Sequence, residues 1–188
     1  VLIVTDAQKL RIAEAFAYSA ASIGAQTVTT VMEPTRHHGA EPPKPVAEAM
    51  KAADVVLIPT TRSLSHTDAR RAATKQGVRL ASMPGITEEM MSIGGLTADY
   101  KEIATLTDKV ATIVEKARTV KITTPSGTDV TMGIEGRTPL RDTGLYHKLG
   151  DWGNLPAGEI CLAPVEGTTN GILVIDSMGA TVSQPLRI

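Results

Sequence analysis

The chain has 188 residues, which is enough for one large domain or two small ones, each with a buried core. Hydrophobic residues make up 42% and charged residues 21% of the chain, a composition that excludes wholesale disorder. The formal net charge of −1 and the aromatic content of 3% exclude a basic or base-stacking surface for nucleic acid.

The first half of the sequence alternates strand-like and helix-like patterns. Short apolar or β-branched runs predict strands at residues 1–5, 27–32, 55–59 and 78–81. Apolar side chains spaced by three and four predict helices at residues 7–23, 46–53, 67–76, 87–92 and 98–117. Parallel strands need helical crossovers, so this alternation predicts a parallel sheet with helices on both faces. Residues 2–4 and 55–58 are apolar throughout, which favours central strands.

The pattern changes after Arg118. Further strand-like runs occupy residues 120–124, 130–132, 159–164 and 171–176. Residues 136–154 are rich in glycine and proline and predict a loop, and no helix pattern follows Arg118. We therefore predict an α/β domain with a Rossmann-like sheet at residues 1–117 and a β-rich domain at residues 118–188. The chain begins in a strand without Met and ends at another apolar alternation, so we expect the second domain to be incomplete.

Apolar runs and cysteine content indicate the compartment. No apolar run approaches the roughly 20 residues of a membrane-spanning helix, and the opening apolar run lacks the basic segment of a signal peptide. Cys161 is the single cysteine, so no disulfide can form within the chain. We expect a cytoplasmic protein with neither a nucleic-acid nor a membrane partner.

The segment from Thr60 to Thr67 follows a predicted strand and opens a predicted helix. Ligands of parallel α/β sheets bind at the carboxyl ends of strands, so Arg62 and His66 are candidate substrate-binding residues. The alternative is that Ser65 or Thr67 caps the helix and that His66 fixes the loop. Neither a G-x-G-x-x-G nor a G-x-x-x-x-G-K-[ST] motif occurs, so nucleotide binding has no motif support.

Glu159 is the candidate metal ligand, because it lies where a loop rich in glycine and proline enters a predicted strand. A carboxylate on a half-buried strand must be paired, hydrogen-bonded or bound to a metal. Glu166 and Asp176 lie on neighbouring segments and could join it, since zinc and hard divalent cations accept carboxylate oxygens. The spacing alone also fits a plain surface glutamate at the start of a strand.

The stretch Asn154-Leu155-Pro156-Ala157-Gly158-Glu159, followed by Ala163-Pro164 and Asn170-Gly171, resembles the aminopeptidase T family of metallopeptidases and its leucyl aminopeptidase-like relatives. Diffuse similarity to the amino-terminal domain of that family extends over residues 53–56, 63–67, 77–79 and 83–87. The resemblance implies a two-domain, often dimeric enzyme with a pair of zinc or cobalt ions. It places the family's metal-binding glutamate at Glu159, with the other ligands expected beyond Ile188.

The same architecture also resembles ring-opening dioxygenases of the 2,5-dihydroxypyridine type, in which two histidines and an aspartate hold one ferrous ion. Those ligands, too, would lie beyond Ile188. The peptidase chemistry uses metal-bound hydroxide, whereas the dioxygenase keeps iron positions open for substrate and oxygen.

As the main function we expect a metal-dependent, aminopeptidase-like hydrolase that removes amino-terminal residues from peptides. Its Glu159 would be a metal ligand, and its partner a second copy in a homodimer. One alternative is the non-haem iron dioxygenase, acting on a small molecule. Another is a non-catalytic binding or oligomerisation module.

Overall fold

The structure, a computed structural model, describes residues 1–176, 186 and 187. The chain divides into two compact units, one of residues 1–104 and 142–158, the other of residues 105–141 and 159–188. The predicted boundary between residues 117 and 118 falls inside the second unit. Of the predicted β-rich domain, residues 177–185 and 188 lie outside the described residues. Among the described helices, none combines the length and apolar character needed to cross a membrane.

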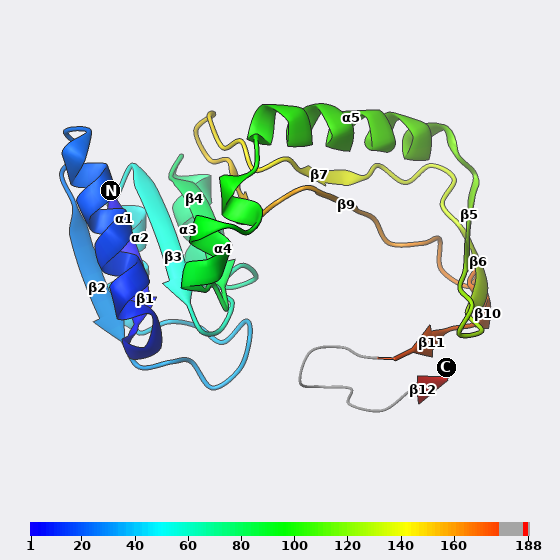
Figure 1. Ribbon diagram of the computed structural model, residues 1–188, viewed down its shortest axis with the longest axis horizontal. Helices are drawn as coiled ribbons and strands as arrows, with labels where there is room; N and C mark the ends of the chain where they lie inside the picture. Colours follow the sequence, from blue (N-terminus) through cyan, green and yellow to red (C-terminus); the bar gives the residue numbers. More distant parts are fainter. Residues whose placement is uncertain (177–185, 188) are drawn as a thin grey trace. The chain divides into compact units, whose positions relative to one another are not determined.

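The first unit is built on a five-stranded parallel sheet with the order β2-β1-β3-β4-β8 (Figure 1). Its strands are β1 (Leu2–Asp6), β2 (Val28–Met32), β3 (Val55–Thr60), β4 (Arg79–Pro84) and β8 (Trp152–Asn154). Every neighbouring pair runs parallel. The two apolar runs that predicted central strands are β1 and β3, which both lie inside the sheet. The predicted α/β class with a parallel sheet is therefore confirmed.

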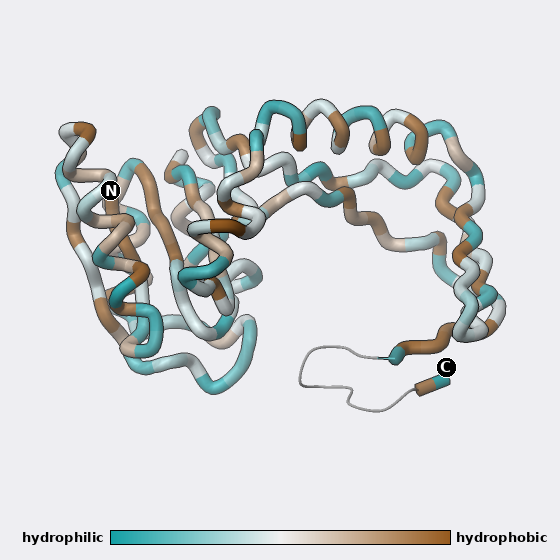
Figure 2. The backbone as a smooth tube through the Cα atoms, viewed as in Figure 1, coloured by the Kyte–Doolittle hydropathy of each residue, from teal (hydrophilic) through white to brown (hydrophobic). Residues whose placement is uncertain are grey.

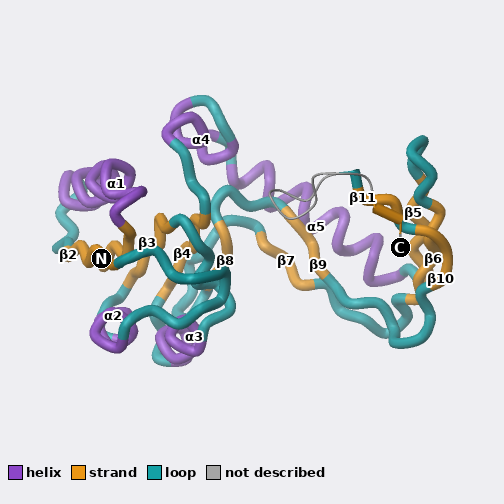
Figure 3. Tube along the Cα trace, turned by 90° about the horizontal axis from the view of Figure 1, so that it is seen from below, coloured by secondary structure: helices purple, strands orange, loops and turns teal. Residues whose placement is uncertain are grey.

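Helices cover both faces of this sheet, as predicted. The helical elements are η1 (Ala7–Lys9), α1 (Leu10–Ser22), α2 (Lys44–Lys51), α3 (Asp68–Lys75), α4 (Glu88–Ser92), η2 (Gly95–Thr97) and α5 (Tyr100–Lys116), which ends in the second unit. Figure 3 shows α1 on one side of the sheet and α2 and α3 on the other. Their starts follow local rules: the side chain of Asp6 caps η1, Thr67 caps α3 and Thr87 caps α4.

Two apolar layers hold the helices to the sheet, because successive side chains of a strand point to opposite faces. Leu2 and Val4 of β1 belong to the layer that packs against α2 and α3, where Met50 is fully buried. The other layer contains Ile12 of α1 and Met83 of β4. Figure 2 shows the hydrophobic colouring that runs along the central strands.

The prediction of a plain loop at residues 136–154 is wrong. The structure places two short strands there, β7 (Leu140–Asp142) and β8 (Trp152–Asn154), and β8 is the edge strand of the parallel sheet. Two of the three residues of β8, Gly153 and Asn154, are of types depleted in strands, so its own propensity does not indicate a strand. Its conformation follows from pairing with β4, in the register Leu80↔Trp152 and Ser82↔Asn154.

Small sheets make up the second unit. The strands predicted at residues 120–124 and 130–132 form a hairpin of β5 (Thr119–Thr123) and β6 (Asp129–Gly133), and β10 (Asn170–Ile172) pairs antiparallel with β6. β9 (Glu159–Cys161) forms a two-stranded sheet with β7, and β11 (Val174–Ile175) pairs with β12 (Leu186–Arg187). Arg141 connects β7 to α5 by ion pairs with Glu115 at 2.6 Å and Asp108 at 3.3 Å.

Candidate functional site

The carboxyl ends of β1 and β3 meet where the strand order reverses, which is the usual ligand position in open α/β sheets. The carboxylate of Asp6, fully buried there, accepts hydrogen bonds from the Gln8 amide at 3.1 Å and the Thr61 amide at 2.5 Å. It also accepts one from the Thr61 hydroxyl at 2.9 Å. These amides are the groups that bind phosphate at other sheets of this kind, so Asp6 makes the position unfavourable for anions. This agrees with the absence of a phosphate-binding motif.

A hydroxyl chain of Ser63, Ser65, Ser82 and Asn154 lies at the carboxyl ends of β3, β4 and β8. The Ser63 hydroxyl donates to Ser65 Oγ at 2.9 Å, and Ser65 Oγ is 2.9 Å from both Ser82 Oγ and Asn154 Oδ1. Ser65 is 2% exposed and Ser82 is fully buried. A serine hydroxyl has one hydrogen to donate, so Ser65 donates to one of these two partners at a time. The chain fixes the β3–α3 loop to the sheet.

Replacing Ser65 by alanine removes the central member of the hydroxyl chain and leaves buried partners unsatisfied. We expect the free energy of unfolding to fall by about 1–3 kcal/mol, measured by urea denaturation followed by circular dichroism. The control is Ser22→Ala, because the Ser22 hydroxyl bonds the Ser19 carbonyl at an exposed position; a change within about 0.5 kcal/mol is expected there. Equal losses in the two variants would contradict a structural role for the chain.

Beside the hydroxyl chain, Arg70, Trp152 and His66 form a second cluster. The Arg70 side chain is 8% exposed, its Nε donates to the Ser65 carbonyl at 2.7 Å, and its guanidinium carbon lies 3.7 Å from the centroid of the Trp152 ring. The His66 ring stands nearly perpendicular to Trp152, at 86° and a centroid distance of 6.2 Å. Burial lowers the pKa of Arg70 below its ordinary value, and the charge of Arg71 lowers it further.

The loop before α2 packs on the same β3–α3 segment. The Gly39 amide donates to the Ser63 carbonyl at 2.8 Å, and His38 Nδ1 accepts from the Ser63 amide at 3.1 Å. The Glu41 carboxylate accepts from two backbone amides in the first turn of α3, at 2.6 and 3.1 Å. Together with the hydroxyl chain, these bonds hold the β3–α3 loop in one conformation.

Both predicted substrate-binding residues lie on this loop. Arg62 and His66 are exposed near the carboxyl end of β3, and the loop between them is anchored by buried Leu64 and Ser65. The alternative interpretation is also partly correct, because Thr67 caps α3 and His66 contacts Trp152. Arg70 and Trp152 were not predicted from the sequence. Neither has a local signal, since the contact between them depends on β8 joining the sheet.

Glu159, the predicted metal ligand, is the first residue of β9 in the second unit and is exposed. Of its two suggested companions, Glu166 pairs with Arg137 at 2.6 Å. Within residues 1–176, 186 and 187, no group of three or more His, Cys, Asp or Glu side chains is arranged to hold a metal ion. The role of Glu159 as a metal ligand therefore stays a prediction.

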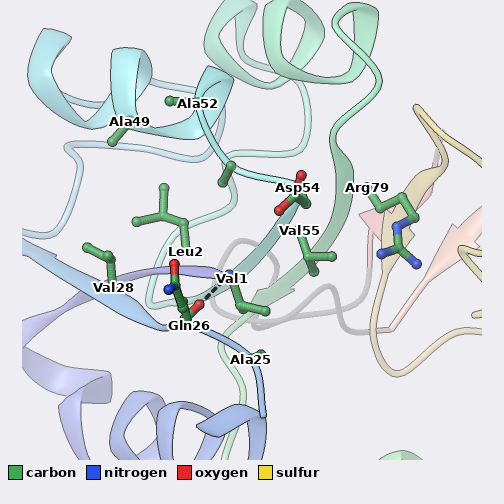
Figure 4. A pocket seen from close by; sticks show the side chains of 11 residues that line it. Val1, Leu2, Ala25, Gln26, Val28, Ala49, Ala52, Asp54, Val55 and Arg79 are labelled. Carbon is green, nitrogen blue, oxygen red and sulfur yellow. Dashed lines mark hydrogen bonds between the residues drawn. The ribbon is translucent and has the colours of Figure 1, made fainter. Parts of the chain in front are cut away.

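Hollows lie at both ends of the parallel sheet. A hollow of about 620 Å³ is at the amino ends of β1 and β3, with mostly small or apolar lining residues, together with Asp54 and Arg79 (Figure 4). Another, of about 460 Å³, is formed by residues 7–12 and 86–88, next to the carboxyl end of β1. The second hollow has the size of a small-molecule site and lies at the end of the sheet where ligands of such folds bind.

A known protein family matches almost the whole chain. The chain matches, over residues 1–184, a family model described as NicX: 2,5-dihydroxypyridine 5,6-dioxygenase. Among curated proteins, no sequence matches the chain.

Among solved structures, the chain resembles 2,5-dihydroxypyridine dioxygenase from Pseudomonas putida KT2440, with 19% identity and a TM-score of 0.71. That match covers 92% of this chain and 52% of the other. The chain also resembles wild-type AmpT from Thermus thermophilus, with 15% identity, a TM-score of 0.58 and coverage of 92% and 58%. It thus spans little more than half the length of these solved relatives, and at such identities the likeness shows the fold.

These findings correct the predicted function. The expected main function, an aminopeptidase-like hydrolase, is wrong, because the family model over residues 1–184 is that of a dioxygenase. The resemblance to aminopeptidase T holds for the fold, as the AmpT match shows. The error arose because the motifs used for the resemblance belong to an architecture that both enzyme groups share.

Proposed function

Because the chain belongs to the 2,5-dihydroxypyridine 5,6-dioxygenase family, we propose that the protein is an oxidoreductase that opens the ring of a dihydroxylated pyridine with molecular oxygen. The observation that carries this proposal is the family match over residues 1–184. In a 5,6-dioxygenation the C5–C6 bond breaks and both oxygen atoms enter the product. The C5 carbon, which bears a hydroxyl, becomes a carboxylic acid, and C6 becomes a formyl group on the ring nitrogen.

The proposal implies iron in place of the zinc or cobalt expected for a peptidase. The described residues contain no set of three side chains that fits a metal ion, so they do not form an iron site by themselves. Glu159 stays a prediction that came from the peptidase resemblance, and the iron content of Glu159→Gln tests it. Glu14→Gln is the matched control, because Glu14 is exposed and is not a candidate ligand.

For the described part of the chain we propose a role in binding and orienting the substrate. Arg62 and His66 project from a loop that is held by buried hydrogen bonds, so both side chains start from a fixed backbone. A guanidinium and an imidazole can both hydrogen-bond the hydroxyl groups of a dihydroxypyridine. Fixed donors of this kind lower the entropic cost of placing a small ring.

The test is oxygen uptake by protein loaded anaerobically with ferrous ion, with 2,5-dihydroxypyridine as substrate. We expect iron-dependent uptake, and a fall in kcat/KM of at least about tenfold in His66→Ala, the size of one lost hydrogen bond to substrate. His147→Ala is the control, since His147 is exposed and lies outside the β3–α3 loop. Iron-loaded protein that takes up no oxygen would refute the proposed function.

A further inference from the structure

Arg70 is a buried cation without a counter-ion in the described part of the chain. Its side chain is 8% exposed, and among the described residues no carboxylate forms an ion pair with it. The neighbouring Arg71, by contrast, is exposed and pairs with Asp68 at 2.8 Å. Arginine is rarely buried to this extent unless it is paired, because removing a charge from water is costly. The position of Arg70 therefore needs a physical explanation.

The known contacts of Arg70 use only part of its guanidinium. Nε donates to the Ser65 carbonyl, and the flat face lies over Trp152. The two terminal nitrogens have no hydrogen-bond partner among the described residues. No buried side-chain nitrogen or oxygen in that part of the chain lacks a partner, so these two nitrogens reach the solvent. The Nε end of the guanidinium is thus held in place, and its two terminal nitrogens are accessible hydrogen-bond donors.

The carboxylates near Arg70 in the fold are engaged elsewhere. Asp68 pairs with Arg71, Glu41 accepts from two amides of α3, and Asp151 accepts from the Lys148 amide at 2.8 Å. The remaining member of the cluster is His66, which is exposed and stands against Trp152. The cluster therefore offers a cation, an aromatic surface and an imidazole, and none of the three supplies a negative charge.

We propose that Arg70, Trp152 and His66 form a binding site for a small carboxylate, which the two terminal nitrogens of Arg70 hold in a bidentate pair. A planar, fixed guanidinium matches the geometry of a carboxylate, and stacking on an aromatic ring reduces the entropy lost on binding. The choice of ligand rests on the proposed function. Opening the ring between C5 and C6 creates a carboxylate that the dihydroxypyridine lacks, so the site distinguishes the product from the substrate.

Trp152 provides the readout, because it is the single tryptophan of the 188 residues. The full chain is titrated with maleamate, a four-carbon carboxylate with an amide, and separately with the neutral diamide of maleic acid. We expect a saturable change in tryptophan emission with maleamate, weakened by added salt, and no response to the diamide. A saturable response to both probes, or to neither, would overturn the proposal.

Variants assign the response to Arg70. Arg70→Met keeps a long side chain without the charge and should weaken maleamate binding at least about tenfold. Arg70→Lys keeps the charge without the pair of terminal nitrogens and should bind maleamate with intermediate affinity. This variant also provides the test if circular dichroism shows that the Met variant does not fold. Arg71→Met should bind like the parent chain. Unchanged affinity in both Arg70 variants would refute the site.

Oxygen uptake on the same protein separates this proposal from the proposed function. Uptake without maleamate binding refutes the carboxylate site and leaves the dioxygenase in place. Maleamate binding by protein that holds ferrous ion and still takes up no oxygen supports the site and refutes the dioxygenase, so the two failures are distinguishable.

Discussion

Replacing Gly153 by alanine is expected to lower the free energy of unfolding by about 2–4 kcal/mol. Gly153 is the buried middle residue of β8, opposite Ala81 of β4. A Cβ at this position would overlap Asp142 Oδ1 and the hydroxyl of Tyr146. The Tyr146 hydroxyl donates to that carboxylate at 2.7 Å, and the other carboxylate oxygen accepts from the Asn154 amide at 2.8 Å. The alanine would therefore push apart the bonds that hold β8.

Urea denaturation followed by circular dichroism measures this loss, and a double-mutant cycle supplies its control. In a Tyr146→Phe background one of the three overlapping atoms, the tyrosine hydroxyl oxygen, is gone, so the added cost of Gly153→Ala should be smaller than in the parent chain. If the two changes are additive within about 0.5 kcal/mol, the overlap with the Tyr146 hydroxyl is not the cause.

Replacing Leu64 by alanine should lower the free energy of unfolding by about 3 kcal/mol, because a buried leucine leaves a cavity when it is shortened. Leu64 is fully buried and belongs to the layer between the sheet and α3. Its backbone carbonyl also accepts from the amide and the hydroxyl of Thr67, at 3.2 and 2.7 Å. The cavity therefore opens below the loop that carries Arg62 and His66.

Two measurements separate local loosening of the β3–α3 loop from destabilisation of the whole unit. Denaturation should show a change within about 0.5 kcal/mol in Leu149→Ala, since Leu149 is 84% exposed. Amide hydrogen exchange should become faster at residues 63–67 in Leu64→Ala, while β1 amides stay protected in native conditions. Faster exchange over the whole sheet, with no preference for the loop, would contradict a local anchoring role for Leu64.

Much of the first unit was predictable because local sequence patterns mark its strands and helices. β1 and β3 begin with uninterrupted apolar runs, at residues 2–4 and 55–58, and Asp6 and Thr67 are caps at the positions where their helices begin. β8 was not predictable, since three residues with a central glycine become a strand through hydrogen bonds to β4. The candidate site was not predictable for the same reason. Asn154 and Trp152 reach Ser65 and Arg70 only after β8 has paired.

Function was harder to predict than fold, for a physical reason. Solved structures of a dioxygenase and of AmpT both match this chain, with TM-scores of 0.71 and 0.58. Residues that shape strands, turns and caps serve either chemistry equally well, whereas the reaction depends on metal ligands, of which the described residues hold no complete set. A motif such as the one that ends at Glu159 therefore indicates an architecture before it indicates a reaction.

The strand order also constrains the sequence of events during synthesis. β4 ends at Pro84, but β8, its outer neighbour, starts at Trp152. While the ribosome adds the intervening segment, the hydrogen-bonding groups along one side of β4 have no β8 to pair with. An open edge of this kind can pair with other nascent chains, so translational pauses in this interval would expose the chain to misassembly. The hydroxyl chain through Asn154 can close only after that interval has passed.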